Sequence, residues 1–566
     1  MIDVHLSAGT RLVLYLKSED DEEKIEWFTD GVVVNIPEEM RPCSILFKFN
    51  ETDDDTPDGI FDGYSISVMF NGFPFDRMQK ALEKFSLFTE TALGEDIRRM
   101  ILYGETHGPA TAASNDFAPV KSATPAYPLA DQLNVQGLSE LNSLQADAIA
   151  QALRRPFTMI QGPPGTGKTE TSAALVYHLF KSNQCRILVC ASSNVAVDHL
   201  CEKINKTGLR VVRLMAKWRE SMPTTMTFPT MREQIKPYIQ QKPVLVDLLR
   251  KRAENMLTQE GKELCDSLML ECEIKLLKSA DVICCTCSGA GERRLEDFSF
   301  PIVLIDEASH ATEPELLIPL VCGEARQAIL VGDHKQLGPV VIDEQAARDG
   351  YSISLFKRMV ALNARPVRLE VQYRMHPCLS IFPSAQFYGG SLQDNFTPSA
   401  SSERIVQSWP RPQKPLMFVH CDDGGETRAG MSRFNNGEII VCRNIVKRWI
   451  KAGVKPEQIG IISPYASQVA RIHQAIFNEF SKVEVATVDI FQGREKDYII
   501  ISCARTQGIG FLKDPGRLNV SITRARYGLV VVGDANNLVQ DPLWASFIRH
   551  CKNESSYVDG LRSYFK

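Results

Sequence analysis

The residues best suited to chemistry in this chain form a loop of small side chains that ends in a lysine. Residues 162–169 read Gly-Pro-Pro-Gly-Thr-Gly-Lys-Thr, which fits the phosphate-binding pattern G-x-x-x-x-G-K-[ST]. A strand-like apolar run, Phe157–Ile160, precedes this loop, and a helix-like run, Ala173–Phe180, follows it. Small residues allow backbone N–H groups to wrap phosphates, and a helix N-terminus favours an anion. The pattern therefore predicts a nucleoside triphosphate site.

Roles follow from position within this loop. Lys168 is predicted to reach the β- and γ-phosphates, and Thr169 is predicted to bind Mg²⁺. The residues expected to surround the phosphates are Gly162, Gly165, Thr166 and Gly167. ATP and Mg²⁺ are therefore the predicted substrate and metal.

Two carboxylates follow a second buried strand, Ile302–Ile305. They should emerge at its carboxyl end, where parallel α/β sheets bind ligands. We predict that Asp306 holds Mg²⁺ and that Glu307 orients and deprotonates the attacking water. The alternative is an ordinary exposed Asp-Glu pair. Gln336 follows a further apolar strand and could link the γ-phosphate to a nucleic-acid site, although alone it would be typical of a polar loop.

Three later strings narrow the class of ATPase. Residues 371–377 read Val-Gln-Tyr-Arg-Met-His-Pro, residues 487–497 contain Phe-Gln-Gly-Arg-Glu-Lys-Asp, and residues 517–526 read Arg-Leu-Asn-Val-Ser-Ile-Thr-Arg-Ala-Arg. In this order they resemble the motifs of superfamily 1 helicases, specifically the up-frameshift RNA helicase family, also called regulator of nonsense transcripts. The resemblance runs from the N-terminal region to about residue 560.

The resemblance implies further nucleotide contacts. Gln145 would bind the adenine edge, and Tyr373 would stack on the base. Arg374 and Arg524, both from the second domain, would act as arginine fingers on the γ-phosphate. Glu495 would approach the ribose and phosphate side. Guanidinium groups suit this role because their fixed forks stabilise charge on a transferring phosphoryl group.

Contacts to a bound nucleic-acid strand are expected at strand ends of the sheets. There, hydroxyls and amides could bind phosphates, and a Pro or Tyr ring could contact a base. The candidates are Ser193, Asn194, Thr286, Pro464, Tyr465 and Thr487. These residue types are also common in ordinary turns.

The predicted fold is α/β, with two tandem RecA-like P-loop domains built on parallel sheets. Alternating β-type runs in residues 1–74 predict a small β-barrel, and residues 75–135 predict stalk helices and a linker. Residues 136–345 would form the first RecA-like domain, with a helical insertion at about 216–279, and residues 346–566 the second.

Composition supports an intracellular protein but does not identify its ligand. No apolar run reaches the eighteen residues of a membrane span, no secretory signal is evident, and the 15 cysteines are scattered as expected for reduced thiols. The net charge of −5 leaves nucleic-acid binding open because charge segregation matters more than the total. We expect a cytoplasmic, monomeric motor without a membrane partner.

By resemblance, the expected function is an ATP-dependent 5′-to-3′ RNA helicase or translocase in nonsense-mediated mRNA decay. Its partners would be single-stranded RNA, with DNA also accepted, and mRNA-decay and translation-termination factors. The alternatives are a DNA-directed superfamily 1 helicase and a non-catalytic, ATP-gated RNA clamp. The departures from the family include three features: His310 stands where relatives usually carry Gln, Ile490 replaces a smaller residue, and we find no Cys/His-rich zinc module before the helicase core.

Overall fold

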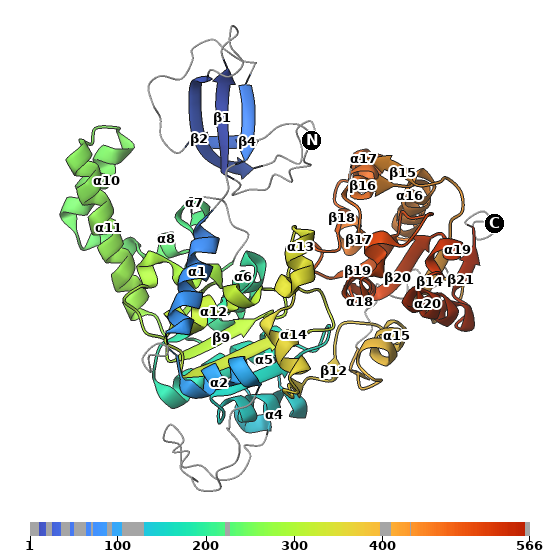
Figure 1. The fold of residues 1–566 in the computed structure, drawn as a ribbon, viewed down its shortest axis with the longest axis horizontal. Helices are drawn as coiled ribbons and strands as arrows, with labels where there is room; N and C mark the ends of the chain where they lie inside the picture. Colours follow the sequence, from blue (N-terminus) through green and yellow to red (C-terminus); the bar gives the residue numbers. More distant parts are fainter. Residues whose placement is uncertain are drawn as a thin grey trace.

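The computed structural model describes ten ranges of the chain: residues 11–17, 25–35, 46–49, 64–68, 72–87, 93–104, 130–220, 227–396, 409–430 and 432–560. Two α/β units dominate the ribbon in Figure 1, each built around its own sheet. Among the described residues, no helix combines the length and apolarity needed to cross a membrane.

The first sheet has seven parallel strands in the order β11-β5-β10-β9-β6-β8-β7. The bounds are β5 (Phe157–Gln161), β6 (Ile187–Ala191), β7 (Val211–Arg213), β8 (Val282–Thr286), β9 (Ile302–Asp306), β10 (Gln327–Gly332) and β11 (Val367–Arg368). The central strands are continuous apolar runs because helices cover both sheet faces. The chief helices around this sheet are α4 (Ser143–Ala152), α5 (Lys168–Asn183), α6 (Asn194–Asn205) and α12 (Glu313–Cys322). Residues between β7 and β8 form a largely helical excursion, α7 (Lys217–Glu220), α8 (Met231–Gln234), α9 (Lys236–Gln240), α10 (Pro243–Ala253) and α11 (Gln259–Ser279).

The second sheet has six parallel strands in the order β18-β17-β19-β20-β14-β21. The bounds are β14 (Leu416–His420), β17 (Ile459–Ser463), β18 (Glu484–Thr487), β19 (Lys496–Ser502), β20 (Ala525–Gly533) and β21 (Tyr557–Asp559). Its helices are α15 (Pro377–Phe387), α16 (Asn436–Lys451), α17 (Ala466–Phe480), α18 (Pro515–Ile522), α19 (Ala535–Leu538) and α20 (Pro542–Asn553). The predicted architecture of two tandem domains on parallel sheets is confirmed.

The N-terminal strands form a separate antiparallel sheet in the order β3-β2-β1-β4. They are β1 (Arg11–Lys17), β2 (Ile25–Asn35), β3 (Leu46–Phe49) and β4 (Tyr64–Val68). These strands match the predicted β-type runs, whereas closure into a barrel stays a prediction. The next helices, α1 (Phe73–Ser86) and α2 (Glu95–Tyr103), bury Ala81, Ile97 and Ile101 in the core of the first α/β unit.

The start of the second domain, predicted at residue 346, stays a prediction, and part of the segment that follows it packs with the first unit. Helix α14 (Leu355–Ala361) buries Leu355, Phe356 and Met359 in the core of the first unit. Strand β11 then pairs in parallel with β5 of the first sheet. The chain therefore leaves the first unit only after β11, because β11 covers the edge of the first sheet beside β5.

Candidate nucleotide-binding site

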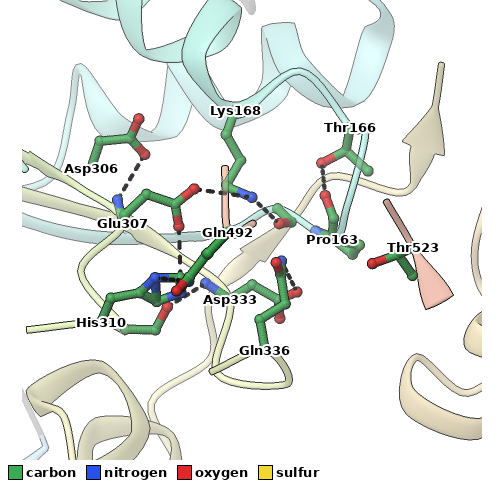
Figure 2. A network of polar contacts seen from close by, with 12 residues as sticks. Pro163, Thr166, Lys168, Asp306, Glu307, His310, Asp333, Gln336, Gln492 and Thr523 are labelled. Carbon is green, nitrogen blue, oxygen red and sulfur yellow. Dashed lines mark hydrogen bonds and ion pairs between the residues drawn. The ribbon is translucent and has the colours of Figure 1, made fainter. Parts of the chain in front are cut away.

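The loop between β5 and α5 is shaped by glycines and by its own hydrogen bonds, and Figure 2 draws the bond between Thr166 and Pro163. Gly165 and Gly167 have φ values of 75° and 77°, a left-handed conformation that glycine adopts without strain. Thr166 Oγ1 donates to the Pro163 carbonyl at 2.8 Å, and Lys168 Nζ donates to the Gly162 carbonyl at 2.9 Å. The lysine side chain is thus folded over the loop whose phosphate it is predicted to bind.

Helix α4 holds this loop from one side. The Asn142 side chain caps α4 by accepting from the Gln145 N–H, and Gln145 Oε1 accepts from the Asn142 N–H in return. Gln145 Nε2 also donates to the Thr166 carbonyl at 3.1 Å. A Cβ added to Gly167 would lie 2.6 Å from that nitrogen, so the glycine permits the close approach. Gln145, predicted to bind adenine, here bridges α4 to the phosphate loop.

Tyr373 reaches the same corner from the segment after β11. Its hydroxyl accepts from Asn142 Nδ2 at 2.8 Å, and its backbone N–H donates to the Gly165 carbonyl at 2.9 Å. The side chain remains 39% exposed, which leaves ring surface for a ligand.

The two carboxylates lie at the carboxyl end of β9, as predicted from their place after an apolar run. The Glu307 N–H donates to Asp306 Oδ1 at 2.9 Å, and Glu307 Oε1 lies 3.8 Å from Lys168 Nζ. Glu307 has a φ of 50°, which is uncommon for a non-glycine residue and carries a conformational cost. This backbone turn directs Glu307 toward the phosphate loop (Figure 2).

The surroundings of Asp306 and Glu307 shift the pKa values of the two carboxyl groups in opposite directions. Burial and the neighbouring Glu307 raise the pKa of Asp306 to about 7. Burial alone would also raise the pKa of Glu307, but the Lys168 ammonium lowers it below its ordinary value. The guanidinium groups of Arg524 and Arg374 act in the same direction on Glu307. Glu307 is therefore the acid kept ionised at neutral pH, as a general base requires.

Arg374 lies directly against the phosphate loop. A Cβ added to Gly165 would be 2.6 Å from Arg374 Cβ. Arg374 Nε donates to Glu495 Oε2 at 2.5 Å, and its Nη1 donates to the Thr523 carbonyl at 3.2 Å. Arg374 thus links the P-loop of the first domain to two residues of the second.

Arg524 approaches the site from the end of α18 and is 2% exposed. Its Nε donates to the Val520 carbonyl at 2.9 Å, and its Nη2 donates to Gln336 Oε1 at 3.1 Å. Burial and the nearby Arg374 lower the pKa of the Arg524 guanidinium below its ordinary value. The first domain therefore supplies Lys168, the carboxylates and Gln336, while the second supplies a guanidinium that reaches Gln336.

The residues of the first domain that are predicted to contact nucleic acid already form hydrogen bonds. Ser193 caps α6 by accepting from the Ala196 N–H at 3.2 Å. Asn194 Oδ1 accepts from the buried Arg213, and Thr286 Oγ1 accepts from the Gly289 N–H. These bonds use one acceptor on each side chain and shape the turns at the ends of β6 and β8.

In the second domain, Pro464 and Thr487 are half-buried, whereas Tyr465 is only 3% exposed. The Tyr465 hydroxyl accepts from Arg505 Nη1 at 3.2 Å and from the Phe511 N–H at 3.3 Å. The prediction that the Tyr465 ring meets a base is wrong for this conformation, because Phe511 lies against the ring, with centroids 5.7 Å apart.

Gln492 is a site residue to which the sequence assigned no role. Its Nε2 lies 2.7 Å from His310 Nε2, and it also contacts Nδ1 of the same ring. His310 Nε2 is in turn 3.6 Å from Glu307 Oε2. Burial lowers the pKa of His310, which favours the neutral ring. The sequence shows the unusual His310 and the motif that contains Gln492, but it does not predict that the two side chains contact each other.

The fold and the site together define a P-loop nucleotide-binding protein with two tandem α/β domains. Two family models match, both described as an AAA domain: one covers residues 140–269 and 249–344, and the other covers residues 351–536.

The curated relatives identify the family. The Regulator of nonsense transcripts 1 homolog of Neurospora crassa is 42% identical, over 99% of this chain and 50% of its own length. ATP-dependent helicase upf1 of Schizosaccharomyces pombe is 42% identical, over 99% of this chain and 60% of its own. ATP-dependent helicase NAM7 of Saccharomyces cerevisiae is 40% identical, over 99% and 56% respectively. The chain belongs to this regulator of nonsense transcripts family and spans about half the length of the curated relatives it matches.

Among solved structures, an arterivirus nonstructural protein 10 helicase in complex with DNA aligns with a TM-score of 0.35 and 12% identity. The alignment covers 69% of this chain and 62% of that one. This likeness is weak and adds nothing to the family assignment.

Proposed function

We propose that this chain is an ATP-dependent RNA helicase or translocase that moves 5′ to 3′ on single-stranded RNA in nonsense-mediated mRNA decay. The observation that carries this proposal is the shared nucleotide site. Arg524 of the second domain contacts Gln336 of the first at 3.1 Å, and Arg374 joins the P-loop side to Glu495. A site divided in this way couples hydrolysis to the opening and closing of two domains.

Asp306 and Thr169 would hold Mg²⁺. Asp306 is 3% exposed, with a pKa raised by burial and by Glu307, so a divalent cation would offset the repulsion between the two acids. Thr169 lies in the first turn of α5, next to Lys168. A hard cation with oxygen ligands suits this donor set. Bound Mg²⁺ supplies charge neutralisation to the β- and γ-phosphates.

The remaining chemistry follows from the positions of the side chains. The loop Gly162–Lys168 would cradle the phosphates, and Lys168 would exchange its bond to the Gly162 carbonyl for a phosphate oxygen. Glu307 would orient the attacking water and accept its proton. Arg374 and Arg524 would stabilise the charge that spreads over the transferring phosphoryl group. Tyr373 would stack on the base, Gln145 would bind the adenine edge, and Glu495 would lie on the ribose side while orienting Arg374.

Single-stranded RNA would cross the carboxyl ends of the strands in both sheets. Ser193, Asn194 and Thr286 would contribute from the first domain, and Pro464 and Thr487 from the second. We add Phe511, which is 54% exposed and rests on the buried Tyr465. The Arg517 guanidinium lies 5.3 Å from the Phe511 ring centroid, and an exposed aromatic beside a cation suits a stacked base.

The wider assignments also belong to this proposal. We divide the chain into an N-terminal accessory β domain, stalk helices and two RecA-like domains, the first of which carries the helical excursion between β7 and β8. We place the protein in the cytoplasm as a monomeric motor. Its partners would be decay and translation-termination factors, as the resemblance of its motifs implies.

Steady-state ATP turnover with and without poly(U) tests the proposal. We expect poly(U) to raise turnover several-fold, because RNA bound across both domains favours the closed site. Unchanged turnover would refute a motor. Stronger stimulation by poly(dT) than by poly(U) would favour a DNA-directed helicase, and ATP-dependent RNA binding without turnover would favour a clamp.

A further inference from the structure

Asp333, at the end of β10, is a buried acceptor on which four donors converge. It is 0% exposed. Its carboxylate accepts from Gln161 Nε2 at 3.2 Å, the Lys335 N–H at 3.1 Å, Gln336 Nε2 at 2.8 Å and the Tyr388 hydroxyl at 2.7 Å. The first three donors belong to the first domain, and Gln161 immediately precedes the phosphate loop. Tyr388 does not belong to that domain.

Tyr388 is carried by the second domain. It caps the C-terminus of α15, whose residues Leu379 and Phe382 pack in the core around the second sheet. The Tyr388 hydroxyl accepts from Asn519 Nδ2 of α18 at 2.7 Å, and the same nitrogen donates to the Lys335 carbonyl at 2.8 Å. Tyr388 is 1% exposed and Asn519 is 0% exposed. Two side chains of the second domain thus form hydrogen bonds with polar groups of the first.

We propose that Tyr388 is a positioning residue that fixes Gln336 for catalysis only when the two domains are closed. This inference rests on the proposed function, because it assigns to one hydroxyl the coupling between domain closure and ATP hydrolysis.

The hydrogen-bond pattern gives the mechanism. Tyr388 and Gln336 Nε2 share one oxygen, Asp333 Oδ2. With its amide nitrogen held there, Gln336 presents Oε1 to Arg524 Nη2. If the domains separate, Tyr388 and Asn519 withdraw, and water can take the place of the phenol on Asp333 Oδ2. The oxygen that anchors Gln336 is then no longer held by a fixed donor.

The chemistry of the phenol suits this role. Burial and Asp333 raise the pKa of Tyr388 well above its ordinary value, so the hydroxyl remains protonated and able to donate. Phenylalanine has the same ring without the hydroxyl, and Tyr388→Phe therefore removes the hydrogen bond while preserving the packing of α15. A hydrogen bond to a charged group contributes enough to change a closing equilibrium about ten-fold or more.

The test measures kcat and KM for ATP in the full chain, with and without poly(U). We expect Tyr388→Phe to lower kcat about ten-fold while the KM for ATP and the thermal midpoint stay near wild type. In a Gln336→Ala background, Tyr388→Phe should cause no further loss, because the group that it orients is gone. Tyr557→Phe is the matched control: its ring stacks on Phe418 in the second domain, and its turnover should equal wild type.

Three outcomes would overturn the inference: wild-type kcat in Tyr388→Phe, losses that multiply in the double variant, or a lowered thermal midpoint that accounts for the loss. If poly(U) fails to stimulate even the wild type, the proposed function falls. The unstimulated kcat of Tyr388→Phe, compared with that of wild type, still decides the role of Tyr388.

Discussion

Replacing Glu307 by glutamine should stop turnover while leaving nucleotide binding intact or improved. The substitution keeps the shape of the side chain but removes the charge that can accept a proton from water. General-base catalysis contributes about 10²- to 10⁴-fold, so kcat should fall by about that factor. The substitution adds no backbone strain at the φ of 50°, because glutamine and glutamate have the same Cβ.

Binding should respond in the opposite direction. Glu307 Oε1 lies 3.8 Å from Lys168 Nζ, a gross attraction of about 4 kcal/mol at an effective dielectric constant of about 20. Desolvation and screening reduce the net value of a partly exposed pair to about 1 kcal/mol. Lys168 must leave this carboxylate to bind phosphate, so Glu307→Gln should tighten ATP binding about five-fold.

A coupled phosphate-release assay and titration with a fluorescent ATP analogue measure the two effects. Glu324→Gln, which changes an exposed carboxylate of the first domain, is the control and should match wild type in both. Turnover within about three-fold of wild type would remove Glu307 from its role as the base. A large loss of nucleotide affinity would show instead that Glu307 holds the ligand.

Three further substitutions test other parts of the account. His310→Gln should keep kcat within about three-fold of wild type, because an amide can still bond to Gln492. His310→Ala should lower kcat further. Equal losses of kcat for the two variants in ATPase assays would contradict this role. Phe511→Ala should weaken binding of a labelled U10 oligonucleotide about ten-fold, a typical stacking contribution, and Phe511→Trp should retain binding; equal affinities would exclude the ring. Burial raises the pKa of Glu438 from an ordinary 4.5 to about 7, so its contribution to stability is present below pH 4.5 and is lost, by about 3 kcal/mol, as the pH rises through 7. Glu438→Gln should flatten this decline in thermal melts between pH 5 and 8, and parallel curves for the two proteins would refute it.

Local patterns were sufficient for the parts of the site that come from one stretch of chain. The phosphate loop and the carboxylates after β9 were predicted because strand, turn and helix are contiguous, and parallel strands bring their carboxyl ends to one edge. The tandem arrangement followed from two sets of buried apolar runs. Each of these inferences depends on neighbours in sequence.

The parts that were missed depend on long-range partners. The return of β11 to β5, the contact of His310 with Gln492 and the insertion of Tyr388 beside Asp333 join residues far apart in the chain. Tyr465 was misjudged for the same reason, since the residue that covers it, Phe511, belongs to a different loop. A motif at the end of a strand shows which side chains could bind a ligand. It does not show which of these side chains are covered by other parts of the chain.

The central claim is that the second domain completes a nucleotide site built on the first. Turnover of Arg374→Ala at saturating ATP and poly(U) tests it most directly, because Arg374 lies against Gly165 of the first domain and pairs with Glu495 of the second. The account predicts a fall in kcat of about 10³-fold or more, with nucleotide binding and thermal midpoint largely preserved. Turnover within a few-fold of wild type would contradict it.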